Sequence, residues 1–147
     1  RSSEQAAEYD MPEDDKESMP DQYKTVSLEE FVEYSKSMFA YWTEDDFASS
    51  FRKMLTIEQF RSEEMQGLYQ QYLSSGPAAY VKDLFESMGI AHAEENAVRF
   101  YATMYFYYSV YDGADDKEKV KNEFASAIGS MAQEWIKQPK LTQIRKS

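Results

Sequence analysis

The sequence predicts an all-α fold, and three observations support that prediction. Apolar residues recur with a helical period of about 3.6 residues between positions 27 and 137. Gly and Pro are scarce, at five and four of 147 residues, which disfavours a turn-rich β fold. No segment alternates apolar and polar residues for long enough to form a strand. The length fits a single domain.

Four helices are expected in the first half of the chain. Ser27 and Glu30 form a capping box, in which each side chain binds the backbone N–H of the other residue. Another helix is expected to begin near Ser62. Gly76-Pro77 has the order expected where one helix ends with Gly just beyond it and the next begins with Pro. The apolar stripes predict helices over 28–42, 47–55, 62–75 and 77–88.

Two longer helices follow, over about 93–111 and about 115–137. The first is apolar all round, which predicts burial on both sides. Asp112-Gly113 closes it, and Asp115 with Glu118 resembles a capping box at the start of the second. Because the turn is short, the two helices should lie antiparallel. Outside 27–137 we expect the end of a helix over 1–10, an acidic loop over 11–26 and a flexible tail over 138–147.

The composition excludes several functions. With 16 basic and 27 acidic residues the net charge is −11, so this chain by itself is a poor ligand for nucleic acid or anionic membranes. No cysteine and one histidine, His92, leave too few side chains for a zinc site, and no apolar run could span a bilayer. The acid pairs lie at helix starts or in loops and are interpreted as caps rather than metal ligands. We therefore expect no metal, no cofactor and no enzymatic activity.

The aromatic content suggests a ligand site. Twelve Tyr, nine Phe and two Trp make up 16% of the chain, and Tyr combines an apolar ring with a polar hydroxyl. Glu58 falls on an otherwise apolar helix face, where a carboxylate must be paired, protonated or facing a cavity. The alternatives are that the tyrosine stripe is ordinary core and that Glu58 faces solvent. The predicted pocket residues are Phe39, Trp42, Met54, Glu58, Leu84, Tyr101, Tyr105 and Tyr108.

The last two helices also predict a homodimer. Each carries a second apolar or small-residue stripe that its own core does not need. Gly129 lowers the stability of its helix, and a second helix that packs closely on it would offset that loss. Two such helix pairs related by a two-fold axis would form a four-helix bundle. The alternative is a solvent-exposed stripe of small residues. The predicted interface residues are Val98, Ala102, Phe106, Val110, Ala125, Gly129, Ala132 and Ile136.

Several motifs resemble the C-terminal domain of tetracycline-repressor-like (TetR family) transcriptional regulators. The similarity spans roughly 27–124 and consists of loose consensus runs. These runs are Arg52–Arg61 with Glu64 and Leu68-Tyr69, Gly76-Pro77 with Tyr80 and Asp83–Phe85, Arg99–Ala102 with Tyr105, and Tyr111–Gly113.

The resemblance implies a six-to-seven-helix effector-binding and dimerisation domain whose last two helices form the dimeric bundle. It also implies that residues 1–10 end a linker helix from a missing N-terminal helix-turn-helix domain, which would bind operator DNA. The expected partners are then a second copy and an unidentified small organic effector, in a cytoplasmic bacterial repressor or activator. A helical interaction or scaffold domain without a ligand is the alternative.

Overall fold

The computed structural model describes residues 27–137, and within them the fold is all-α, as predicted. The segments expected at 1–10, 11–26 and 138–147 lie outside the described residues. No strand occurs between residues 27 and 137. The helices are α3 (Leu28–Glu44), α4 (Asp46–Glu58), α5 (Glu63–Leu73), α6 (Ser75–Ser87), α7 (Ala93–Gly113) and α8 (Lys117–Lys137).

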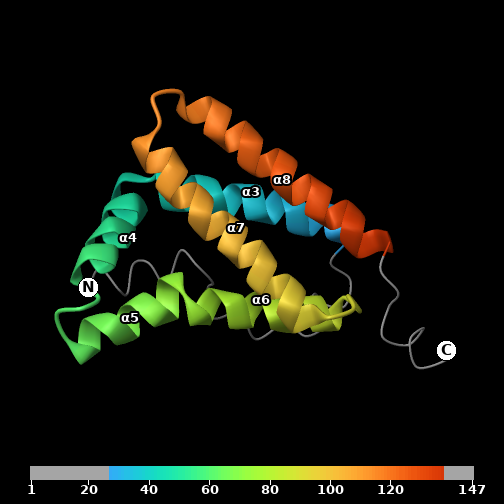
Figure 1. Ribbon diagram of the computed structural model, residues 1–147, viewed down its shortest axis with the longest axis horizontal. Coiled ribbons are helices and arrows are strands. Elements are labelled where there is room, and N and C mark those ends of the chain that lie inside the picture. Colours follow the sequence, from blue (N-terminus) through green and yellow to red (C-terminus); the bar gives the residue numbers. More distant parts are fainter. Residues whose placement is uncertain (1–26, 138–147) are drawn as a thin grey trace.

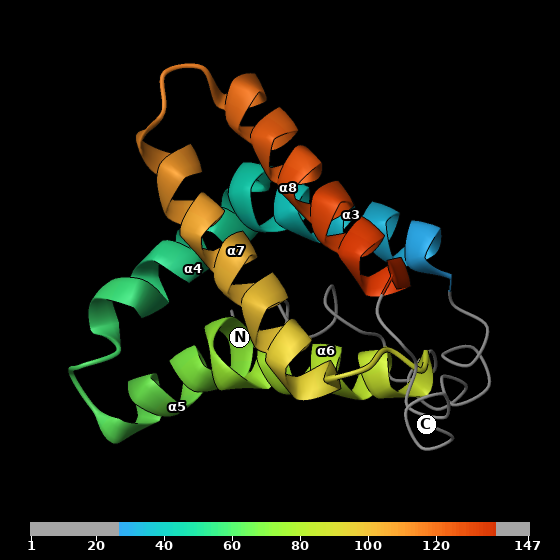
Figure 2. The same cartoon turned by 45° about the vertical axis from the view of Figure 1, so that its right-hand side comes forward.

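The helix α7 is the centre of the arrangement. It crosses α6 and forms an antiparallel hairpin with α8, while α3 packs against both α7 and α8 (Figure 1). The helices α5 and α6 run nearly end to end, and α4 connects α3 to α5 (Figure 2). One side of α7 therefore faces the rest of the bundle, and the predicted antiparallel pairing of the last two helices is confirmed.

The starts of α3 and α5 agree with the sequence prediction. The Ser27 hydroxyl accepts from the Glu30 backbone N–H at 3.0 Å, and the Glu30 carboxylate accepts from the Ser27 N–H at 2.9 Å. Ser62 caps α5. At α8, however, it is Asp116 whose carboxylate accepts from Lys119 N–H, at 3.1 Å, so the capping box predicted at Asp115 is wrong by one residue.

The junction of α5 and α6 differs from the prediction. Gly76 does not lie beyond the end of a helix but inside the first turn of α6, and Pro77 follows it there. Pro is tolerated in a first turn because its missing N–H would have no partner within the helix. A Cβ on Gly76 would lie 2.2 Å from the Gln71 carbonyl oxygen, so this position requires glycine for close backbone approach.

The turn between α6 and α7 holds a strained residue. His92, which precedes α7, has a φ of 55° and is exposed, and its side chain makes no cap hydrogen bond. A non-glycine residue pays about 1 kcal/mol in this left-handed region. We therefore expect His92→Gly to raise the free energy of unfolding by about 0.5–1 kcal/mol in urea titrations. An unchanged or lower value would show that the backbone is not strained there.

The core consists mainly of aromatic rings. Phe31, Phe85, Phe100 and Trp135 contact one another with ring centroids 4.7–6.4 Å apart. Such a cluster ties α3, α6, α7 and α8 together. The expectation that α7 is buried all round is wrong for this chain alone, because its far side is exposed at Val98 and Phe106.

Candidate functional site

The residues predicted for the ligand site come from α3, α4, α6 and α7, and most are core residues. Five of them are buried, Met54 is partly buried against the core, and Tyr105 is 38% exposed. The buried five are Phe39, Trp42, Leu84, Tyr101 and Tyr108. Their role in binding a ligand stays a prediction.

Four of these side chains form a continuous row of rings. Phe39 stacks on Tyr108 with centroids 5.6 Å apart, and Tyr105 contacts Tyr108 at 6.4 Å and Tyr101 at 6.2 Å. The Tyr101 hydroxyl donates to the Leu73 carbonyl oxygen at 2.6 Å. The row is therefore buried at both ends, Phe39 and Tyr101, and reaches the surface only at Tyr105 between them.

Where the row reaches the surface, the hydroxyls of Tyr105 and Tyr69 are hydrogen-bonded to each other. Burial raises the pKa of Tyr69 to about 12, and the hydrogen bond with Tyr105 adds to the rise. Beside them, Gln66 donates to the Gln59 carbonyl oxygen at 3.1 Å. This pair of phenols, of which Tyr69 is buried and Tyr105 partly exposed, joins α5 to α7 and offers polar groups next to apolar rings, as small-molecule sites require.

The raised pKa of Tyr69 makes stability depend on alkaline pH. The unfolded chain releases this proton near the ordinary pKa of 10.0, whereas the folded chain keeps it until about pH 12, so stability falls between these values. We expect Tyr69→Phe to lose less stability than the wild type between about pH 9 and about pH 11. Urea unfolding at both pH values measures this, and equal losses would contradict it.

Glu58 is the last residue of α4, and its carboxylate forms an ion pair with Arg61 in the following turn. The side chain is 25% exposed. The sequence left open whether this carboxylate is paired, protonated, facing a cavity or facing solvent. It is paired, with a residue only three positions away. The carboxylate needs no further partner to be satisfied.

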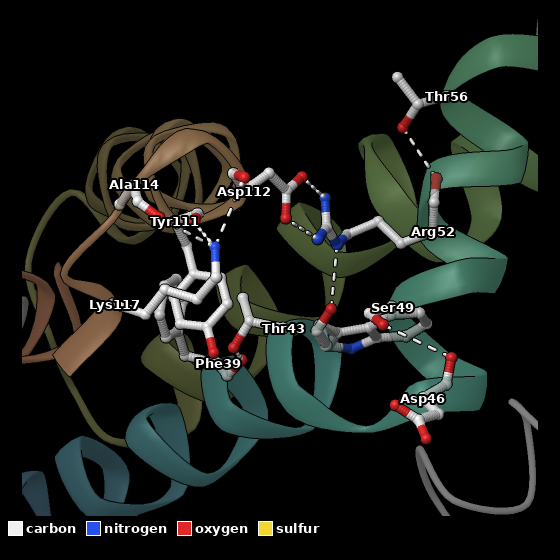
Figure 3. A network of polar contacts seen from close by, with 11 residues as sticks. Phe39, Thr43, Asp46, Ser49, Arg52, Thr56, Tyr111, Asp112, Ala114 and Lys117 are labelled. Carbon is white, nitrogen blue, oxygen red and sulfur yellow. Dashed lines mark hydrogen bonds and ion pairs between the residues drawn. The ribbon is translucent and has the colours of Figure 1, made fainter.

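A buried arginine that was not predicted as a site residue joins three helices (Figure 3). Arg52 of α4 donates from Nε to the Trp42 carbonyl oxygen at 3.0 Å. Its two terminal nitrogens donate to both carboxylate oxygens of Asp112 at 3.0 and 2.8 Å. The guanidinium carbon lies 4.9 Å from the centre of the Tyr108 ring. Arg52 thus ties the end of α3 and the end of α7 to α4, directly beside the row of rings.

The position of Arg52 gave a weak signal in the sequence. It lies one turn from both Ala48 and Leu55, which are fully buried, so a basic residue there had to be paired. The partner is 60 positions away, and no local pattern could identify it.

Two lysines secure the turn between α7 and α8. Lys117 Nζ donates to the carbonyl oxygens of Tyr111 at 2.7 Å and Ala114 at 3.2 Å, which satisfies the end of α7 (Figure 3). Lys121 lies 2.6 Å from the Glu44 carboxylate, and this hydrogen bond raises the pKa of Lys121. The hairpin is therefore anchored to α3 at the same end as the Arg52 junction.

The side of α7 that faces away from the core is apolar and exposed. Val98 is 54% exposed and Phe106 60%, and Ala102 between them is exposed as well. We call these three residues the outer stripe of α7. Val110 is half-buried one turn further along. The sequence predicted this stripe, and in the described chain nothing covers it.

The predicted stripe on α8 is only partly exposed. Ile136 is 61% exposed, while Ala125 and Gly129 are half-buried, and nothing lies within 4 Å of a Cβ built on Gly129. Ala132, in contrast, is buried in the chain's own core, so its assignment to the interface is wrong. It lies four residues after Ile128 and so shares the buried face of α8.

An open groove of about 460 Å³ runs between α7 and α8 beside the outer stripe. Ala127 and Met131 form part of its α8 side, although they were not predicted for an interface. None of the eight predicted ligand residues lines it. Its lining residues are Asn96, Arg99, Ala102 and Thr103 of α7 and Ala127, Met131, Glu134 and Trp135 of α8.

Residues 27–137 offer neither a metal centre nor a membrane span. This part of the chain has no group of His, Cys, Asp or Glu side chains that could hold a metal ion. None of its helices combines the length and apolar character needed to cross a membrane. Comparisons with protein-family models, with curated proteins and with solved structures find no match to this chain.

Proposed function

We propose that this chain is the effector-binding and dimerisation domain of a TetR-like bacterial transcriptional regulator. In this proposal the homodimer forms through the outer side of the α7–α8 hairpin. A small organic molecule binds at the row of rings, which is exposed at Tyr105. Operator DNA is bound by a helix-turn-helix domain N-terminal to this chain, in a cytoplasmic protein.

One observation carries the proposal: α7 contributes three tyrosines to the row of rings and presents an exposed apolar stripe on an adjoining side. Tyr101 and Tyr108 face the core, Val98 and Phe106 are exposed, and the exposed Tyr105 lies at the boundary, two turns from Val98. An exposed apolar stripe of this kind typically marks a protein interface. A ligand that displaced the inner rings would therefore move the helix that carries the interface.

Such an arrangement would work by a population shift. The effector stabilises one of two positions of α7. Because α7 also forms the dimer interface, each position gives a different distance between the two DNA-binding domains. A coupling free energy of about 1–3 kcal/mol between effector and DNA is ordinary for such systems.

A helical interaction domain without a small-molecule ligand is the second candidate. It is favoured by the Tyr101 hydroxyl, which is already satisfied by the Leu73 carbonyl, and by the close stacking of Phe39 on Tyr108. Both features describe a filled core rather than a cavity. Ligand binding separates the two candidates.

The experiment is a ligand screen read by the fluorescence of Trp42. Trp135→Phe first removes the other tryptophan, which lines the α7–α8 groove. We expect small organic hits whose affinity falls at least about tenfold with Tyr105→Ala. Tyr34→Ala is the matched control, because Tyr34 of α3 is 37% exposed, nearly as much as Tyr105. Hits that bind both variants equally, or no hits at all, would favour the second candidate.

A further inference from the structure

The α7–α8 groove and the exposed ring of Phe106 lie on the same side of the hairpin. The groove has α7 residues 96–103 on one side and α8 residues 127–135 on the other. Phe106 lies one helical turn beyond Ala102 and Thr103, which line the groove, and it is 60% exposed. A cavity and a protruding ring of the same chain are thus neighbours on one face.

We propose that Phe106 of a second copy fills this groove, and that the exchange is reciprocal about a two-fold axis. This inference rests on the proposed dimer and specifies its register. If two α7 helices run antiparallel about an axis near Thr103, position 106 of one copy lies at the level of position 100 of the other. That level is the middle of the groove, whose α7 residues are 96, 99, 102 and 103.

The charges on this face fit the same register. Arg99 is exposed, and its contact with Glu95 in its own chain is long, at 3.5 Å. The two-fold axis brings Arg99 of the second copy to the level of Tyr107. The Tyr107 ring contacts Phe124 of α8, so the exposed Glu123 lies beside that level. An Arg99–Glu123 pair would form twice in the dimer, which offsets part of the repulsion between two chains of net charge −11.

The groove is open, and its lining combines Ala, Met and Trp with a few polar groups. An aromatic ring surrounded by small and flexible side chains is the usual anchor of a protein interface. The second copy is therefore the occupant that the shape, the register and the charges favour together.

The test uses two complementary variants. Phe106→Ala removes the inserted ring, and Ala102→Trp fills the groove from a position that is exposed in the single chain. We expect each variant alone to weaken the homodimer about 30-fold in sedimentation equilibrium. A mixture of the two should form a heterodimer at least about tenfold tighter than either homodimer, because Phe106 of one chain then meets the open groove of the other.

Phe60→Ala is the control, since Phe60 in the turn between α4 and α5 is 84% exposed and lies far from the hairpin in sequence. It should leave the dimer constant unchanged, and circular dichroism should show every variant to be helical. A wild-type dimer that both variants leave intact, or a mixture no tighter than the separate variants, would overturn the insertion of Phe106 and leave the proposed function standing. A monomeric wild type would overturn both.

Discussion

Arg52→Ala is expected to lower the free energy of unfolding by about 3 kcal/mol. The substitution leaves the Trp42 carbonyl oxygen without its donor and the Asp112 carboxylate without its bidentate partner. It also removes a side chain that is only 6% exposed and that packs on the Tyr108 ring. Urea unfolding followed by circular dichroism measures the loss.

The neighbouring Lys53 provides the control, because it is exposed on the same helix. Lys53→Ala should change stability by less than about 0.5 kcal/mol. Asp112→Ala should cost nearly as much as Arg52→Ala, since it leaves a buried cation unpaired. The double variant should then cost little more than either single one. Additive losses would mean that the two side chains do not act as one unit.

The two helical glycines of α5 and α6 are expected to respond oppositely to alanine. Gly76→Ala places a Cβ 2.2 Å from the Gln71 carbonyl oxygen, and the backbone must move to relieve that clash. We expect a loss of about 2–3 kcal/mol. Gly67→Ala meets nothing within 4 Å on the exposed side of α5, so it should stabilise the protein by about 0.5–1 kcal/mol.

The difference between these two variants is the informative quantity. Both add one methyl group to a helix, so helix propensity alone predicts the same sign for both. Thermal unfolding of the pair therefore tests the close contact between α5 and α6 directly. Two stabilising substitutions would show that Gly76 is not held against Gln71.

Local signals in the sequence predicted most of the fold. The helical period places all of α3 to α8 within a few residues, and Ser27 and Ser62 cap their helices because capping involves only the next three residues. Where a signal had two readings, tertiary packing decided between them. The Gly76-Pro77 pair predicted a helix end before Pro77, but the helix already ends at Leu73, where Ser74 leaves helical geometry, and Gly76 is required for a close backbone approach.

The candidate site was less predictable, since it depends on contacts between distant segments. The sequence of α7 predicts which residues share a face, but not how deeply each ring is buried. Of the three tyrosines in the row, only Tyr105 reaches the surface. Ala132 was predicted to lie in the interface stripe of small residues, but in α8 it faces the core. The Arg52–Asp112 pair closes a separation of 60 residues that no periodicity encodes.

Disulfide trapping of Ala102→Cys tests the central claim, a dimer through the outer side of α7, most directly. The chain has no cysteine of its own, so any cross-link must involve the introduced residue. A two-fold axis near Thr103 places position 102 of one copy level with position 104 of the other, so the two copies of position 102 are offset by only about 3 Å along the helices. On the facing sides of two packed helices their Cα atoms then lie close to the roughly 7 Å limit that a disulfide allows. We expect mild oxidation to convert this variant into a covalent dimer that reduction reverses, while Phe60→Cys, exposed in the turn between α4 and α5, stays largely monomeric. Equal cross-linking of the two variants, or none for either, would contradict the dimer proposed here.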